Sequence, residues 1–235
     1  MTSNDLYDLL RVLDFKTPID RIPEDLRDRL AGFLRTEKEY RHEWRVKRLL
    51  TSSGIRPHQL RTFDQFDWSF NPKFPKEDIL TFRNSPWIEN GANLVMIGDP
   101  GLGKSHTVKA LCYDAILKGH SAVFITAFDL IAKIRKAANL AAKIEYYGGV
   151  VRVLAIDELG YTCHSREEGD LLFQIISKRS ERYPTLITTN LVPKQWGSIF
   201  SGPAASAILD RLSYQGTFVT LPEGEKSHRP ERKRK

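Results

Sequence analysis

An eight-residue segment, GDPGLGKS at positions 98–105, joins an apolar run to a helix-forming run. The apolar run NLVMIG precedes it, and the run SHTVKALCYDAILKG, with Gly119 as its stop, follows. The spacing G-x-x-x-x-G-K-S is the phosphate-binding loop pattern, which requires a strand before it and a helix after it. The chain is therefore expected to fold around a strand–loop–helix unit of the α/β class.

Each residue type in this loop has a chemical reason. Glycines let the backbone turn so that its N–H groups face phosphates, and the positive end of the following helix adds to the attraction. Lys104 is predicted to reach the β- and γ-phosphates of ATP, and the Ser105 hydroxyl to ligate Mg²⁺. Asp99 is an acid near phosphates, so its side chain is expected to point outward. The candidate ATP-binding residues of the loop are Gly98, Asp99, Pro100, Gly101, Leu102, Gly103, Lys104, Ser105 and His106.

A second apolar run, VVRVLAID, ends in Asp157 and Glu158. An acid pair at a strand end is what a phosphate-binding loop needs for hydrolysis: Asp157 would hold Mg²⁺ through a water molecule, and Glu158 would orient or deprotonate the attacking water. Asn190, at the end of TLITTN, is a candidate for positioning the same water or is a simple turn residue. Arg211 is a candidate for stabilising transition-state charge in a neighbouring subunit, or for a surface ion pair.

Apolar and helical runs alternate from residue 93 onward. Continuous apolar strands separated by helices predict a parallel sheet covered on both faces. The strands are expected in NLVMIG, SAVFITA, VVRVLAID and TLITTN, and a single helix is expected over 128–147. Four regions result: a helical domain over 1–62, an aromatic connector with a short helix over 63–92, the ATPase core over 93–225 and a basic tail over 226–235.

The net charge of +7 is unevenly placed. Residues 35–61 contain eight Lys/Arg and three Glu, and residues 226–235 contain six Lys/Arg and one Glu. Two basic regions on a mildly acidic body suggest nucleic acid as the partner, with a solvated surface and tail as the alternative. The chain starts with acids where a secretory signal has bases, its apolar runs are too short to span a bilayer, and Cys112 and Cys163 have no metal-site spacing. We expect a cytoplasmic protein with reduced thiols.

One helix is expected from Glu24 to the Ser-Ser-Gly54 stop. At 100° per residue, its second half places Lys38, Arg41, Arg45 and Arg48 on one stripe. Phe33, Tyr40 and Trp44 fall on the adjacent stripe. Basic residues beside aromatics suit a DNA backbone. Alternatively, the aromatics pack this helix onto its neighbour.

With these motifs assembled, the chain resembles the IstB family, the ATP-dependent helper proteins of a bacterial insertion-sequence group, in the DnaC/DnaA-like branch of AAA+ ATPases. The resemblance is densest in IGDPGLGKSHTVKAL, DELGY, REEGDLLFQIISKR and TTNLVPKQWG. It departs at TCHS after DELGY and at GEKSHR, residues 224–229, where the family has Gly-Glu-Ser-Tyr-Arg.

The resemblance implies an AAA+ core in which residues 98–105 are Walker A, Asp157 and Glu158 are Walker B, Asn190 is sensor 1 and Arg211 acts in trans. It makes Arg229 the candidate for sensor 2 and places DNA-tracking residues on the helix that carries Lys133, Arg135, Lys136 and Lys143. It further implies an ATP-dependent oligomer, ring or spiral, on double-stranded DNA that recruits or stimulates a transposase. A replicative helicase loader of the same branch and a P-loop kinase for a small metabolite remain alternatives.

Overall fold

The chain divides into two packed units, Met1–Leu49 and Leu50–Lys235. The computed structural model describes residues 3–60, 62–160, 165–200 and 202–222. The predicted basic tail therefore lies outside the described residues, as do Cys163, Arg229 and most of the TCHS departure.

The larger unit contains a five-stranded sheet in the order β2-β3-β4-β1-β5. Every strand pair is parallel, so the carboxyl ends of all five strands lie along one edge. The strands are β1 (Leu94–Ile97), β2 (Ala122–Thr126), β3 (Val153–Leu159), β4 (Thr185–Thr189) and β5 (Thr217–Thr220). Four of them were expected, and β5 was not. Because β4 lies between β1 and β3, its end separates the phosphate loop from the acid pair.

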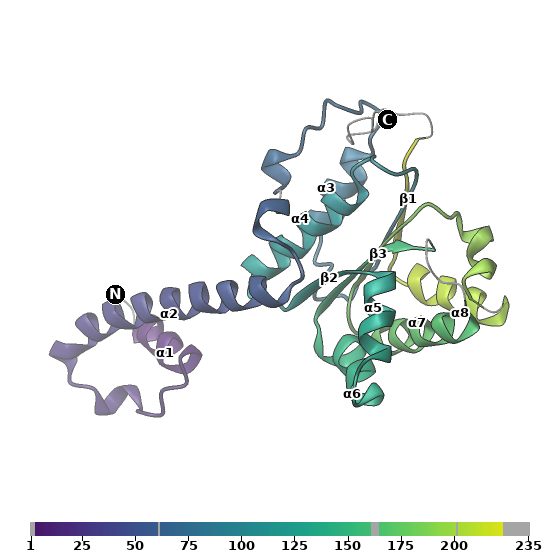
Figure 1. Ribbon diagram of the computed structural model, residues 1–235. Helices are drawn as coiled ribbons and strands as arrows, with labels where there is room; N and C mark the ends of the chain where they lie inside the picture. Colours follow the sequence, from purple (N-terminus) through teal and green to yellow (C-terminus); the bar gives the residue numbers. More distant parts are fainter. Residues whose placement is uncertain (1–2, 61, 161–164, 201, 223–235) are drawn as a thin grey trace. The chain divides into compact units, whose positions relative to one another are not determined.

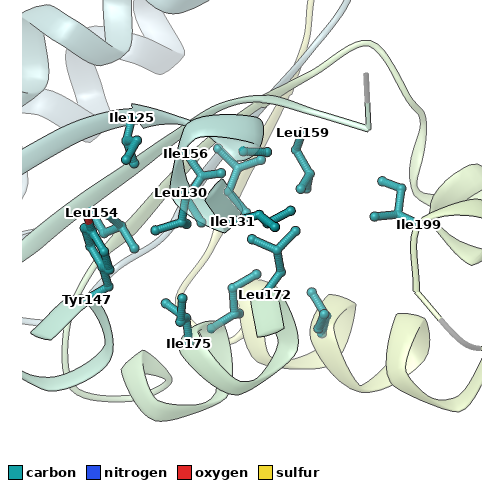
Figure 2. Packing of buried hydrophobic residues seen from close by; sticks show 14 of the residues in the cluster. Ile125, Leu130, Ile131, Tyr147, Leu154, Ile156, Leu159, Leu172, Ile175 and Ile199 are labelled. Atoms are coloured by element: carbon teal, nitrogen blue, oxygen red, sulfur yellow. The ribbon is translucent and has the colours of Figure 1, made fainter. Parts of the chain in front are cut away.

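Helices cover both faces of the sheet (Figure 1). Leu154 and Ile156 of β3 belong to the core cluster that contains residues of α5, α7 and α8 (Figure 2). Asp157 points to the opposite face, where the first turn of α4 lies. The helices of this unit are α3 (Lys76–Asn84), α4 (Lys104–Leu117), α5 (Ala127–Arg135), α6 (Leu140–Glu145), α7 (Arg166–Arg179) and α8 (Gly202–Ser213).

The prediction of a single helix over 128–147 is wrong. It is broken between α5 and α6, where the Asn139 side chain accepts a hydrogen bond from the Ala142 amide at 2.9 Å and so starts a new helix. After α6 the chain makes a wide turn over Tyr146–Val150. The buried guanidinium of Arg179 holds this turn by donating to the carbonyl oxygens of Tyr147 and Val151 at 2.7 and 2.8 Å.

The smaller unit consists of α1 (Ser3–Val12), a short 3-10 turn (Ile19–Arg21) and most of α2 (Glu24–Ser52). Its apolar core is formed by Leu6, Leu9, Leu10, Leu13, Ile22, Ala31 and Leu34. Beyond Leu34, α2 has no buried residue. The aromatic stripe does not pack: Phe33, Tyr40 and Trp44 are 62%, 57% and 60% exposed.

The aromatic connector belongs by its packing to the larger unit. It contains a 3-10 turn at Phe63–Gln65, followed by α3. The segment before it also belongs to the larger unit: it has a 3-10 turn at Pro57–Gln59, and the Ser53 carbonyl accepts a hydrogen bond from the Phe124 amide of β2 at 2.7 Å. The boundary between the two units therefore falls at Leu49, within α2, whereas the sequence suggested residue 62.

Candidate nucleotide-binding site

The phosphate-loop motif lies between β1 and α4, where the spacing placed it. All four residues of β1 are buried, and α4 begins at Lys104. Gly101 and Gly103 have φ angles of 88° and 95°, in the left-handed region that favours glycine. A Cβ atom at Gly103 would also lie 3.2 Å from the Phe66 ring. The loop therefore depends on glycine both for its turns and for the close approach of the connector.

Lys104 folds back over the loop. Its Nζ donates hydrogen bonds to the carbonyl oxygens of Gly98 and Asp99, at 2.6 and 2.7 Å. Asp99 and Pro100 are exposed, so the Asp99 side chain does point outward as expected, and Leu102 is buried. The ammonium is thus held at the mouth of the loop, with its donors beside the space that phosphates would enter.

Three side chains from three elements meet at the sheet edge. The Ser105 hydroxyl donates to Asp157 Oδ1 at 2.8 Å, and the Thr188 hydroxyl donates to the same oxygen. Asp157 is only 6% exposed. A buried carboxylate needs hydrogen-bond donors, and these two hydroxyls supply them. Thr188 was not singled out in the sequence, because a threonine inside a buried strand is typical of any β-strand.

Glu158 has an unusual backbone. Its φ is 57°, in the left-handed region that non-glycine residues seldom adopt. Its side chain is exposed, whereas its neighbours Asp157 and Leu159 are buried. Its amide donates to the Thr188 hydroxyl at 3.0 Å. Unusual φ values of this kind are concentrated at functional sites.

A cavity of about 620 Å³ opens beside the loop. One side is formed by the connector and the other by the phosphate loop and the ends of β3 and β4. The lining residues are Gln65, Phe66, Asp67, Phe70, Pro100, Gly101, Gly103, Lys104, Ser105, His106, Glu158, Thr188 and Thr189. The Phe66 ring lies 4.7 Å from the His106 ring and 4.3 Å from the Trp68 ring, measured between centroids. The connector thus supplies the aromatic wall of the cavity.

The other two candidate catalytic residues lie elsewhere. Asn190 follows β4 and is exposed, and it does not line this cavity. Arg211 lies in the last turn of α8, donates to the Ala207 carbonyl at 2.9 Å and stacks on Phe173. No carboxylate of the described residues lies within ion-pair distance of Arg211, so the alternative of a surface ion pair is wrong there.

The predicted DNA-contacting residues of the larger unit differ in their surroundings. Arg135 is paired with Glu168 at 2.9 Å and with Glu167 at 3.6 Å. Lys133 instead lines a groove of about 560 Å³, together with Arg56 and Lys109. Lys136 is the exposed residue at the end of α5. This groove is also lined by Asp129 and Asp157, and it shares Ser105 and Glu158 with the cavity described above.

The basic stripe of the smaller unit faces α1. Lys38, Arg41, Arg45 and Arg48 all line a groove of about 990 Å³ between the two helices. Arg41 is held there, because it donates to Glu37 at 2.5 Å and to the Leu13 carbonyl at 3.3 Å. On the neighbouring face, the Trp44 indole donates to the Tyr40 hydroxyl at 2.8 Å.

Cys112 does not line the nucleotide cavity or either of the two grooves. It is fully buried in α4, and this burial raises the pKa of its thiol to about 12. It is therefore a small core residue that stays protonated at neutral pH. A membrane-spanning helix needs about 20 apolar residues, and none of the helices in the described ranges meets that requirement of length and apolarity.

The chain is similar to proteins encoded by insertion sequences. The sequence model described as IstB-like ATP binding protein matches residues 23–235. The ATP-binding protein of insertion sequence IS21 from Pseudomonas aeruginosa is 32% identical over 89% of this chain and 78% of its own length. The IS232 ATP-binding protein from Bacillus thuringiensis subsp. berliner is 34% identical over 73% of this chain and 70% of its own length.

The fold has solved counterparts. The crystal structure of DnaI is similar with a TM-score of 0.59 and 19% identity, over 74% of this chain and 95% of that chain. At this identity the similarity concerns the fold, which is the AAA+ arrangement of a parallel sheet with flanking helices expected from the sequence.

Proposed function

Because this chain belongs to the IstB-like ATP-binding protein family, we propose that it hydrolyses ATP with Mg²⁺, assembles as an oligomer on double-stranded DNA and assists a transposase. The observation that supports hydrolysis is the meeting of four side chains at one sheet edge. Lys104 and Ser105 come from α4, and Asp157 and Glu158 from β3. Two of them, Ser105 and Asp157, are in direct contact at 2.8 Å.

The oxygen donors present suit Mg²⁺. Mg²⁺ at nucleotide sites is bound through one or two carboxylates plus substrate phosphates, and it keeps several waters. Ser105 Oγ and Asp157 Oδ1 form such an incomplete set. Within the described residues there is no group of three His, Cys, Asp or Glu side chains that would hold a metal alone. When bound with ATP, the ion would neutralise charge that develops on the phosphates.

The protein's own groups would act as follows. Lys104 exchanges its two loop carbonyls for phosphate oxygens, and the loop amides bind the remaining phosphate charge. Glu158, exposed in the cavity wall, accepts a proton from the attacking water or orients it. A small-molecule kinase needs no such acid beside its metal-binding aspartate, so Glu158 favours hydrolysis. Ser105 and Thr188 keep the Asp157 carboxylate in one orientation.

The aromatic connector is proposed to contact the base. Its residues Phe66 and Phe70 line the cavity that also contains Lys104 and Ser105. Aromatic rings in a cavity wall are suited to the face of a purine. The polar side chain of Gln65 lies in the same wall and is available to the edge of the base.

DNA is proposed to contact both units. The groove of the smaller unit contains four basic residues of α2, and the groove beside Glu158 contains Arg56, Lys109 and Lys133. Phosphate contacts of this kind give affinity without sequence preference. Arg211 is proposed to reach the nucleotide of a neighbouring protomer. The insertion-sequence relatives favour transposition over the helicase-loader alternative.

The test is the full chain with Glu158→Gln. The variant is expected to bind ATP, to hydrolyse it at least about 100-fold more slowly, and to remain as a stable oligomer on duplex DNA. Glu181→Gln is the matched control, because Glu181 is also exposed and left-handed, with φ 63°, but precedes β4 and lies at the opposite sheet edge. Phosphate release and sedimentation with ATP and duplex DNA provide the measurements. A Glu158→Gln protein that stays monomeric, or that hydrolyses ATP like the wild type, would refute the proposal.

A further inference from the structure

Thr188 occupies a special position in the sheet. It lies in β4, the strand between the phosphate-loop strand and the acid-pair strand, and it is 1% exposed. Ile156 pairs with Ile187 and Leu159 pairs with Thr189, so both Asp157 and Glu158 lie opposite Thr188. Two residues opposite one define a β-bulge, a feature that often redirects side chains next to active sites.

The Thr188 hydroxyl contacts both residues of the bulge. It donates its hydrogen to Asp157 Oδ1 and accepts the Glu158 amide hydrogen at 3.0 Å. A hydroxyl has one donor and two acceptor positions, so both bonds form together. A valine of the same shape would make neither bond, although it would suit the buried strand as well.

These two bonds have different consequences. Since Ser105 Oγ also donates to Asp157 Oδ1, the carboxylate cannot rotate without losing two hydrogen bonds. The bond from the Glu158 amide stabilises the residue whose φ is 57°. Without it, the part-buried Glu158 amide would lose this partner at the point where β3 leaves regular pairing with β4.

We infer that Thr188 is a positioning residue for Mg²⁺: its hydroxyl orients the Asp157 carboxylate toward the ion and holds the bulge that directs Glu158 into the cavity. This inference rests on the proposed ATP hydrolysis. It gives β4 a role in the chemistry that differs from the one proposed for Asn190. Hydrogen-bond partners of metal ligands typically change metal affinity by about 10- to 100-fold when they are removed.

The experiment compares Thr188→Val and Thr188→Ser in the full chain. A fluorescent ATP analogue carrying a methylanthraniloyl group is bound first in EDTA and then over a Mg²⁺ titration. Thr188→Val is expected to bind the analogue normally in EDTA and to need at least about tenfold more Mg²⁺ for half of the Mg²⁺-dependent change. Thr188→Ser, which keeps the hydroxyl, is expected to lie within about threefold of the wild type.

A control variant distinguishes the positioning role of Thr188 from the effect of losing any buried hydroxyl in β4. Thr185, at the other end of β4, is equally buried, and its hydroxyl accepts a hydrogen bond from Arg179 Nε at 3.1 Å, away from the nucleotide cavity. Thr185→Val is expected to lower the melting temperature without the same shift in the Mg²⁺ midpoint. Hydrogen exchange in the absence of nucleotide adds a second readout: the Glu158 amide loses protection in Thr188→Val and keeps it in Thr188→Ser.

The outcomes are distinct. A wild-type Mg²⁺ midpoint in Thr188→Val, an equal defect in Thr188→Ser, or an equal shift in Thr185→Val overturns the positioning role while ATP binding stands. Loss of analogue binding in EDTA by Thr188→Val also overturns it, because the site has then collapsed. Failure of the wild-type protein to bind the analogue at all refutes the proposed function, and the inference with it.

Discussion

At the scale of single residues, Glu158 combines the reactive group with an uncommon backbone. A left-handed non-glycine residue costs on the order of 1 kcal/mol or more, and the rest of the fold has to stabilise it. Here the Thr188 hydroxyl accepts the Glu158 amide hydrogen, and Gly160, two residues later, is also left-handed at 99°. The backbone conformation that positions the Glu158 carboxylate therefore lowers the stability of the protein.

Glu158→Gly is expected to raise the free energy of unfolding by about 0.5–1 kcal/mol while abolishing ATP hydrolysis, since glycine adopts this φ without strain. Thermal denaturation and phosphate release are the two measurements. Glu181→Gly, at φ 63°, should be stabilising without the loss of hydrolysis. If Glu158→Gly is clearly less stable than the wild type, the strain assigned to this residue is absent.

Functional residues could be predicted from the sequence where they belong to a motif with a characteristic spacing. Glycines 98, 101 and 103, Lys104 and the Asp157–Glu158 pair follow a spacing that chemistry imposes, and the structure places them at one sheet edge. Thr188 could not be identified in this way, because threonine is common in buried strands and its role depends on a bulge in the neighbouring strand. The aromatic wall was equally hidden, since packing alone brings Phe66 to the loop.

At the scale of elements, hydrophobic pattern predicted most strands and helices but not their interruptions. The apolar positions of α5 and α6 continue in one helical phase, and the break depends on the Asn139 cap. The short strand β5 was missed because it has only four residues, of which one is fully buried. Local hydrogen bonds and strand pairing decided both cases, and neither is visible in the periodicity of side chains.

The helix α5 offers a direct comparison of two basic residues. Lys133 lines the groove with Arg56 and Lys109, and no carboxylate of the described residues lies within ion-pair distance of it. Arg135 is paired with two glutamates of α7. Lys133→Gln is therefore expected to weaken duplex binding and to reduce the slope of log K against log salt by about 1.

Arg135→Gln should leave that slope nearly unchanged and cost at most about 1 kcal/mol of stability, as is usual for exposed ion pairs. Fluorescence anisotropy of a labelled duplex at several salt concentrations measures the first effect, and urea denaturation the second. If Lys133→Gln and the wild type have equal salt slopes for duplex binding, Lys133 and its groove do not contact DNA phosphates.

At the scale of the whole molecule, the two units carry different parts of the proposed function. The nucleotide cavity is formed only by residues of the larger unit, and the groove of α1 and α2 only by residues of the smaller one. The order of strands, which places β4 between β1 and β3, was not accessible to the sequence because it depends on long-range pairing. The separation of the basic stripe from the ATP-binding motif could be predicted, because the sequence shows directly where basic residues and the motif lie along the chain.

This separation gives a prediction for the full chain. Replacing Lys38, Arg45 and Arg48 together by glutamine removes three positive charges from one groove of the smaller unit. If each neutralises one phosphate, the salt slope of duplex binding falls by up to about 3. The affinity for the fluorescent ATP analogue should stay within about twofold, because no residue of that groove lines the nucleotide cavity.

Anisotropy titrations with duplex DNA, with and without ATP, provide the test. The charge-matched control carries Lys38→Arg, Arg45→Lys and Arg48→Lys. That control should keep the salt slope, because counterion release depends on charge number more than on side-chain shape. A triple variant with unchanged DNA affinity would assign the phosphate contacts to the larger unit alone. A parallel loss of nucleotide affinity would instead mean that the two units do not act separately, since the substituted groove and the ATP cavity have no residue in common.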